Sequence, residues 1–105
     1  MATYNKLVRD KIPEIISASG KKANCRILGK DEYIKELDRK LDEECAEYWT
    51  DKNIEELADI LEVIYAIVEA RGYSAAELER VRLEKSEKRG GFSQRIFLEN
   101  VKDQN

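Results

Sequence analysis

Four acidic residues in the middle of the chain are spaced so that their carboxylates could act together. Glu44 and Glu47 are three residues apart, and Glu56 and Asp59 are also three residues apart. Residues with this spacing lie on the same face of a helix, so each pair would present two carboxylates side by side. Hard oxygen ligands of this kind suit magnesium or manganese, and a bound cation would relieve the repulsion within the group.

The two acidic pairs are placed symmetrically about a short polar break in the sequence. The break is centred on Asp51 and Lys52. If helices flank it and fold back on each other, Glu44 comes level with Asp59, and the two inner acids come level with each other. The sequence therefore predicts a helical hairpin that gathers four carboxylates in one small volume near its loop.

Each acid also has a purely structural interpretation. Asn53 and Glu56 form a capping box in its Asn form, and Asp59 and Glu62 could belong to a solvated helix face. Glu44, by contrast, falls beside the apolar stripe of its own helix, where a carboxylate is costly unless it has a partner. The joint pattern favours a metal site, while caps and solvated faces without a metal stay open as the alternative.

The apolar pattern predicts one all-α domain over residues 1–105, because helical spacing recurs along most of the chain. Asp10 can cap a short first helix, with Pro13 in its first turn and Gly20 at its end. Residues 25–28 and residues 92–98 lack this spacing and are expected to be short extended pieces.

Two long helices form the predicted hairpin, and a third long helix follows. Asp31 is expected to cap the first, Asn53 starts the second, and Gly72 ends it. A charged helix with a thin apolar stripe then runs from Ser74 to Gly90. The first long helix carries one continuous apolar stripe, made of Ile34, Leu37, Leu41, Cys45 and Tyr48.

The second long helix has more apolar surface than a single hairpin can cover. A helix that is apolar on all sides must be buried by other elements. We therefore expect a homo-oligomer, a dimer or a tetramer, that completes the hairpin into a four-helix-type bundle. The apolar run consists of Ile60, Leu61, Val63, Ile64, Tyr65, Ile67 and Val68.

Composition excludes several classes of protein. The net charge is -3, with both signs interspersed, which argues against binding a nucleic-acid polymer or a membrane surface. No segment resembles a signal peptide or a membrane span. Cys25 and Cys45 have no metal-binding spacing, so we expect reduced thiols and a cytoplasmic protein. Because the chain has no histidine, any catalysis must use carboxylates, Lys, Arg, Tyr or a metal-bound water.

The acidic motifs carry a resemblance to a known family. Residues 41–47 and 55–63 resemble the paired ExxE and ExxD motifs of the all-α nucleoside triphosphate pyrophosphohydrolases, which include MazG-like proteins, dimeric dUTPases and phosphoribosyl-ATP pyrophosphohydrolases. Residues 7–13 and 88–92 are similar to a compact MazG-like subgroup, the phosphoribosyl-ATP pyrophosphohydrolase-like proteins. Together these stretches extend the resemblance over nearly the whole chain.

The resemblance implies a helical oligomer that cleaves the bond between the α and β phosphates of a nucleotide. The products would be a nucleoside monophosphate and pyrophosphate. Mg²⁺, or Mn²⁺, would bind through Glu44, Glu47, Glu56 and Asp59, and would lower the pKa of an attacking water. Glu47 is our first choice for the residue that accepts the proton of this water, with Glu43 or Glu62 as alternatives.

Basic and aromatic residues complete the expected site. The cations expected to meet the phosphates are Lys40, Lys85, Lys88 and Arg89. Three further cations near the start of the chain, Lys6, Arg9 and Lys11, could form a solvated basic face or contact phosphate. The aromatic side chains that could stack on a base are Tyr4, Tyr33, Tyr48 and Trp49, although each could equally belong to the core or to an interface.

Two alternative functions stay open. One is the hydrolysis of phosphoribosyl-ATP in histidine synthesis, which predicts that this compound is cleaved in preference to simple triphosphates. The other is a non-catalytic, metal-binding helical interaction module, which predicts that magnesium raises thermal stability without any turnover of nucleotides.

Overall fold

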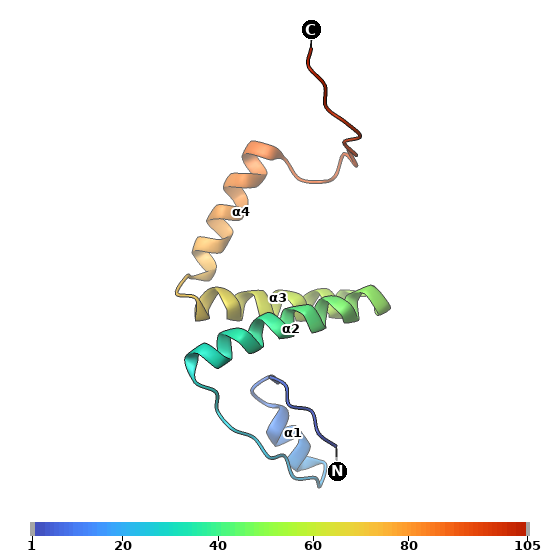
Figure 1. Ribbon diagram of the computed structural model, residues 1–105. Coiled ribbons are helices and arrows are strands. Elements are labelled where there is room, and N and C mark those ends of the chain that lie inside the picture. The colour runs from blue at the N-terminus through green and yellow to red at the C-terminus, as the bar shows by residue number, and fades with distance from the viewer. Residues whose placement is uncertain (1, 105) are drawn as a thin grey trace. The chain divides into compact units, whose positions relative to one another are not determined.

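The computed structural model describes residues 2–104 and contains four helices (Figure 1). The helices are α1 (Ile12–Ala18), α2 (Lys30–Asp51), α3 (Ile54–Ala70) and α4 (Ala75–Arg89). No strand occurs among these residues, so the predicted all-α class is confirmed. The chain forms two compact units, Met1–Ala75 and Ala76–Asn105. That it acts as a single domain stays a prediction.

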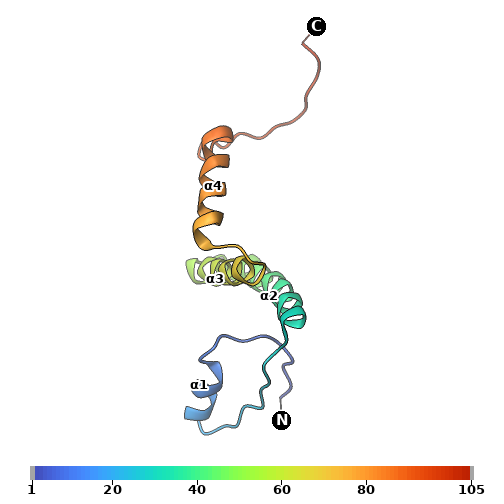
Figure 2. The ribbon, with the colours of Figure 1, turned by 90° about the vertical axis from the view of Figure 1, so that its left-hand side faces the viewer.

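Helices α2 and α3 form the predicted hairpin and pack along each other in both views (Figures 1 and 2). Lys52 ends α2 in the left-handed conformation, with φ of 50°, and its backbone N–H donates to the carbonyl of Tyr48 over 2.8 Å. Asn53 then caps α3, since its Oδ1 accepts a hydrogen bond of 3.1 Å from the backbone N–H of Glu56. The reversal at Asp51 and Lys52 and the Asn53 cap are thus confirmed.

The interior of the described residues is small. Its buried hydrophobic side chains are Leu37 of α2 and Val63 of α3, and one charged residue, Glu44, is also buried. At about 100° per residue, a second apolar stripe falls on the face of α3 opposite Val63. The residues of this outer stripe are between 44% and 72% exposed, and they are Ile54, Leu57, Leu61 and Tyr65.

Two predicted helix caps are wrong by one or two residues. Helix α1 is preceded by Lys11 rather than capped by Asp10, although Pro13 lies in its first turn as predicted. Helix α2 is preceded by Gly29, and Asp31 lies inside its first turn. A carboxylate in the first turn interacts favourably with the positive end of the helix dipole. An acid near the start of a helix can therefore stand either at the cap position or inside the first turn, and its presence in the sequence does not tell the two apart.

The two segments expected to be extended differ in the structure. Residues 25–28 lie outside any helix, and Arg26 there donates two hydrogen bonds to Glu32, of 3.0 and 2.7 Å. Residues 92–98 begin with a turn, in which the backbone N–H of Arg95 donates to the carbonyl of Phe92 over 3.1 Å. An uninterrupted extended segment over 92–98 is therefore wrong.

Helix α4 in the second unit is a charged helix, as its sequence predicts. Leu78 is the one residue of this helix that is not exposed. Its surface carries internal ion pairs, including Arg80 with Glu84 at 3.1 Å. The helix ends at Gly90, which takes a φ of 81° that most other residues avoid. None of the described helices combines the length and the apolar character that crossing a membrane requires.

Candidate metal centre

The four acids of the paired motifs converge in the hairpin. One carboxylate oxygen from each lies within 4.8 Å of the corresponding oxygens of the other three, and the group consists of Glu44, Glu47, Glu56 and Asp59. Helix α2 supplies the first two and α3 supplies the other two. We call this group the acidic cluster. The predicted convergence of the side chains is present, whereas the binding of a metal by them stays a prediction.

Two oxygens of the acidic cluster are buried without a hydrogen-bond partner. They are Oε2 of Glu44 and Oε2 of Glu56. Glu44 is only 7% exposed, so its charge has lost most of its contact with water. A buried polar atom without a partner is unfavourable, and a buried carboxylate more so. A positively charged or proton-donating partner at these two oxygens would therefore stabilise the cluster.

The pKa values of two acids in the cluster also show that their negative charge is insufficiently neutralised. Burial raises the pKa of Glu44, and the neighbouring charge of Glu47 raises it further, while Lys40 opposes both effects. The pKa of Glu56 is also raised, first by desolvation and then by the charges of Glu47, Asp51 and Asp59. Two of the four carboxyl groups thus hold their protons more tightly than a carboxyl group in water.

Lys40 and Lys6 neutralise part of this charge from the α2 side. The Nζ atom of Lys40 lies 3.5 Å from Oε1 of Glu44 and 3.4 Å from Oε2 of Glu43. The Nζ atom of Lys6 donates to Oε1 of Glu43 over 2.9 Å. The hydrogen bond from Lys6 is the main reason that the pKa of Glu43 is lowered. Glu43 is therefore an ion-paired carboxylate at the edge of the cluster.

Arg9 reaches the acidic cluster from the α3 side. Its Nη2 atom donates to Oδ1 of Asp59 over 2.8 Å. For Lys6 and Arg9 the sequence predicts either a solvated basic face or a contact with phosphate. It does not predict that both residues pair with acids of the hairpin. These pairs join residues 37 and 50 positions apart, and no periodicity in the sequence marks such a contact.

The remaining predicted site residues differ in their exposure and surroundings. Glu47 is the most exposed member of the acidic cluster. Lys85, Lys88 and Arg89 are exposed near the end of α4 in the second unit, and their binding of phosphate stays a prediction. Glu62 lines an open hollow of about 400 Å³ with Asp10, Tyr33, Tyr65, Ala66, Glu69 and Ala70.

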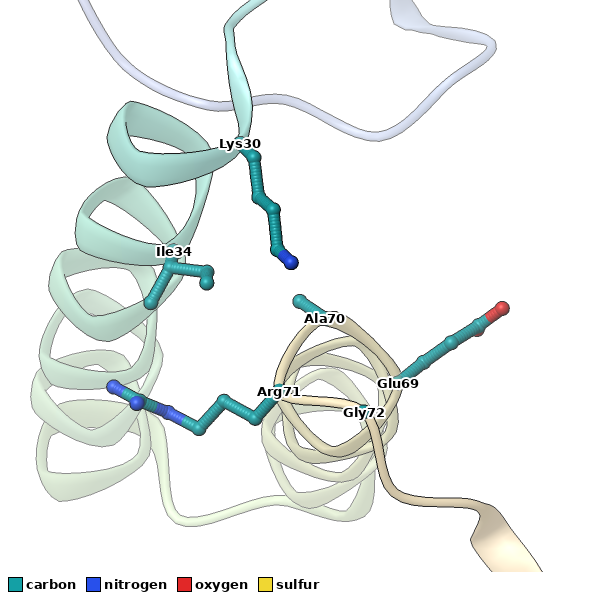
Figure 3. Close-up of a pocket in the computed structure, with 6 residues that line it drawn as sticks. All are labelled: Lys30, Ile34, Glu69, Ala70, Arg71 and Gly72. Atoms are coloured by element: carbon teal, nitrogen blue, oxygen red, sulfur yellow. The ribbon is translucent and has the colours of Figure 1, made fainter.

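A second open hollow, of about 500 Å³, lies at the far end of the hairpin (Figure 3). It is lined by Lys30, Ile34, Glu69, Ala70, Arg71 and Gly72. Figure 3 shows Lys30 pointing toward Ala70 across the gap between the start of α2 and the end of α3. Ile34 precedes Glu44 by ten residues of helix, or about 15 Å, so this hollow is separate from the acidic cluster.

The aromatic residues differ in their surroundings. Of those considered for base stacking, Tyr33 lines a hollow, the one that Glu62 also lines. Tyr48 and Trp49 contact each other edge to face, with ring centroids 5.4 Å apart. The ring of Tyr4 lies 6.0 Å from the Nζ atom of Lys6. Stacking of any of them on a base stays a prediction.

Comparison with known proteins adds one relative. Over 41 residues the chain is 61% identical to an uncharacterized protein of Mycolicibacterium smegmatis, and the aligned stretch covers 39% of this chain. The match spans 42% of that protein, less than half of its length. No family model matches the chain. No solved structure matches it either.

Proposed function

We propose that the protein is a Mg²⁺-dependent nucleoside triphosphate pyrophosphohydrolase, which cleaves the bond between the α and β phosphates and releases a nucleoside monophosphate and pyrophosphate. The observation that carries the proposal is the acidic cluster, in which four carboxylate oxygens lie within 4.8 Å of one another. The reaction class comes from the resemblance of the paired motifs to the all-α pyrophosphohydrolases.

The residues present fit a magnesium or manganese ion. All four donors are carboxylates, the hard oxygen ligands that these cations prefer. The buried Oε2 atoms of Glu44 and Glu56 have no partner among the described residues, and a cation would satisfy them. When bound there, Mg²⁺ would screen the polyphosphate and lower the pKa of a water molecule. Its ligands would be Glu44, Glu47, Glu56 and Asp59.

Other functions at the site, proton transfer and phosphate binding, would fall to individual side chains of the chain. Glu47 is exposed, and we assign to it the acceptance of a proton from the attacking water. Glu43 is a weaker candidate, because its ion pair with Lys6 lowers its pKa and so its affinity for a proton. Lys40, beside Glu43 and Glu44, would meet negative charge on the substrate. For Lys85, Lys88 and Arg89 of α4, the proposal of phosphate binding rests on the sequence alone.

We further propose that the protein acts as a homo-oligomer. The outer stripe of α3 exposes four large apolar side chains on the face away from Val63, and such a surface favours burial against another helix. A second copy of the hairpin would bury both stripes against each other and complete a four-helix-type bundle. A dimer is the smallest assembly that does so.

The first test is a turnover assay of the purified protein with Mg²⁺ or Mn²⁺. Its substrates are a panel of nucleoside triphosphates and phosphoribosyl-ATP, and the assay separates pyrophosphate from orthophosphate. We expect pyrophosphate release that is lost in Glu44→Gln and kept in Glu55→Gln. Glu55 is a suitable control because it is exposed on α3 and pairs with no cation in the described part of the chain.

Each other outcome selects an alternative. A clear preference for phosphoribosyl-ATP would support a role in histidine synthesis. Binding of Mg²⁺ without turnover of any nucleotide would support the interaction module. Unchanged turnover in Glu44→Gln would show that the acidic cluster is not the site of the chemistry.

A further inference from the structure

The segment before α1 bridges the two helices of the hairpin at the acidic cluster. Lys6 donates to Glu43 of α2 over 2.9 Å, and Arg9 donates to Asp59 of α3 over 2.8 Å. Glu43 immediately precedes Glu44, and Asp59 belongs to the cluster itself. Two cations from one short segment therefore lie at the point where the proposed metal ligands converge.

These ion pairs are open to solvent. The side chains of Lys6 and Arg9 are 43% and 58% exposed, and those of Glu43 and Asp59 are 30% and 38% exposed. Ion pairs this exposed contribute little to stability, so they can exchange partners at a small cost. Lys40, whose side chain is 16% exposed, is instead held within α2 between two acids of its own helix.

The side chains of Lys6 and Arg9 are not held by regular secondary structure. Residues 2–9 belong to no helix or strand, and the carbonyl of Arg9 accepts a hydrogen bond of 3.1 Å from the backbone N–H of Ile12, which a change of side-chain partner leaves in place. The guanidinium of Arg9 can bind phosphate oxygens with two parallel hydrogen bonds, and the ammonium of Lys6 can meet the same charge as a point cation. Both properties fit a polyphosphate ligand better than a fixed structural contact.

We propose that Lys6 and Arg9 are substrate-binding residues that change partners: they neutralise Glu43 and Asp59 in the absence of metal, and they bind the polyphosphate once Asp59 is engaged by a divalent cation. This inference rests on the proposed function, since it assigns two residues to the phosphates of its substrate. Both acids keep a cation beside them after the exchange, because the divalent cation replaces Arg9 at Asp59 and Lys40 still lies 3.4 Å from Glu43 when Lys6 turns to the polyphosphate.

The exchange of partners predicts effects of opposite sign on two ligands, both measurable by calorimetry without catalysis. Arg9→Ala removes a cation that competes for Asp59, so Mn²⁺ alone should bind several-fold more tightly than to the natural chain. Inorganic triphosphate in saturating Mg²⁺ should bind about ten-fold more weakly, because a charge-assisted contact is lost. Lys6→Ala should weaken triphosphate binding in the same direction. Inorganic triphosphate serves as the probe because it tests phosphate contacts without a base.

Lys22→Ala is the matched control, since Lys22 is an exposed cation of the same unit with no ion pair in the described part of the chain. It should change neither affinity. Triphosphate affinity that is unchanged in both Lys6→Ala and Arg9→Ala would overturn the inference while leaving the proposed function intact. Loss of Mn²⁺ and triphosphate binding together would also overturn it, because it would show a structural role. A natural chain that binds no triphosphate in Mg²⁺ would contradict both the proposed function and this inference.

Discussion

The Nζ atom of Lys40 lies 3.5 Å from Oε1 of Glu44, one turn further along α2. The pair partly neutralises a buried carboxylate but leaves its other oxygen, Oε2, without a partner. A carboxylate in this state is costly for the folded protein and has one oxygen free for another cation. This relationship connects the stability of the hairpin with its capacity to bind metal.

Glu44→Gln should separate these two properties. In the natural chain, Mg²⁺ at about 100 times its Kd should stabilise the fold by about 2.7 kcal/mol through mass action. The variant should lose this increase, because it lacks one of the four carboxylates. Without metal, its Tm should equal or exceed that of the natural chain, since a buried charge has been removed. Thermal unfolding with Mg²⁺ and with a chelator measures both effects.

Glu55→Gln provides the comparison for this experiment, since it removes an exposed charge from the other helix of the hairpin. It should keep the full increase in Tm with Mg²⁺. An equal response of the two variants to Mg²⁺ would contradict a metal site at the acidic cluster.

The stability of the metal-free protein should fall as pH rises above about 4.5. Glu44 and Glu56 have folded pKa values raised above their ordinary value of 4.5. In the window between the ordinary and the raised values, the folded state keeps protons that the unfolded chain has released, so stability decreases with pH. Glu43 has the opposite sign, because its pKa is lowered, and its contribution is lost only as pH falls below 4.5.

Excess Mg²⁺ should reverse the trend above pH 4.5, because a metal binds the deprotonated carboxylates and protons compete with it. Urea unfolding across this range, with a chelator and with Mg²⁺, measures the two slopes. A chelated protein whose stability rises steadily through the window would contradict the raised pKa values. The Glu44→Gln variant should show a smaller slope than the natural chain in the chelated samples.

Leu61→Glu should disrupt the proposed oligomer. Leu61 is 46% exposed in the outer stripe of α3, and a buried glutamate there would be strongly unfavourable in a helix interface. Light scattering with size-exclusion chromatography should show a shift to monomer. Leu83→Glu on α4 makes the same chemical change at a residue that is 53% exposed and outside the stripe, and it should leave the mass unchanged. A monomeric natural chain would refute the assembly outright.

Asn53→Ala should destabilise the hairpin by about 1 kcal/mol, the usual effect of losing a helix cap. The side chain of Asn53 accepts the backbone N–H of Glu56 over 3.1 Å, and alanine offers no acceptor. Urea unfolding measures the change in the free energy of unfolding. Asn53→Asp should keep most of the stability, because aspartate is an equally good cap; an equal loss in both variants would argue against the capping role.

The hairpin and its cluster could be predicted because their signals are local. Polar residues at the break, the Asn53 cap and the three-residue spacing of the acids all act within a few turns of helix. Glu44 and Asp59 meet because the two-residue link leaves α3 little freedom to choose another register. Helix starts were predicted less well: Asp10 lies one residue before the cap position of α1, and Asp31 lies in the first turn of α2, where a carboxylate is also favourable.

The contacts of the N-terminal segment could not be predicted in the same way. Lys6 and Arg9 belong to a segment without regular structure, and they meet acids 37 and 50 residues away. Helical periodicity carries no information about such pairs, because it relates only residues on one element. The reaction itself depends on the resemblance of the motifs and stays a prediction until turnover is measured.

The short link between α2 and α3 also has a kinetic consequence. All four acids come from residues 44–59, so closing the hairpin is a local event that can occur early and fast. The same event brings four negative charges together, which opposes closure when no cation is present. A divalent ion bound at these residues would therefore accelerate the folding of the chain as well as stabilise its final state.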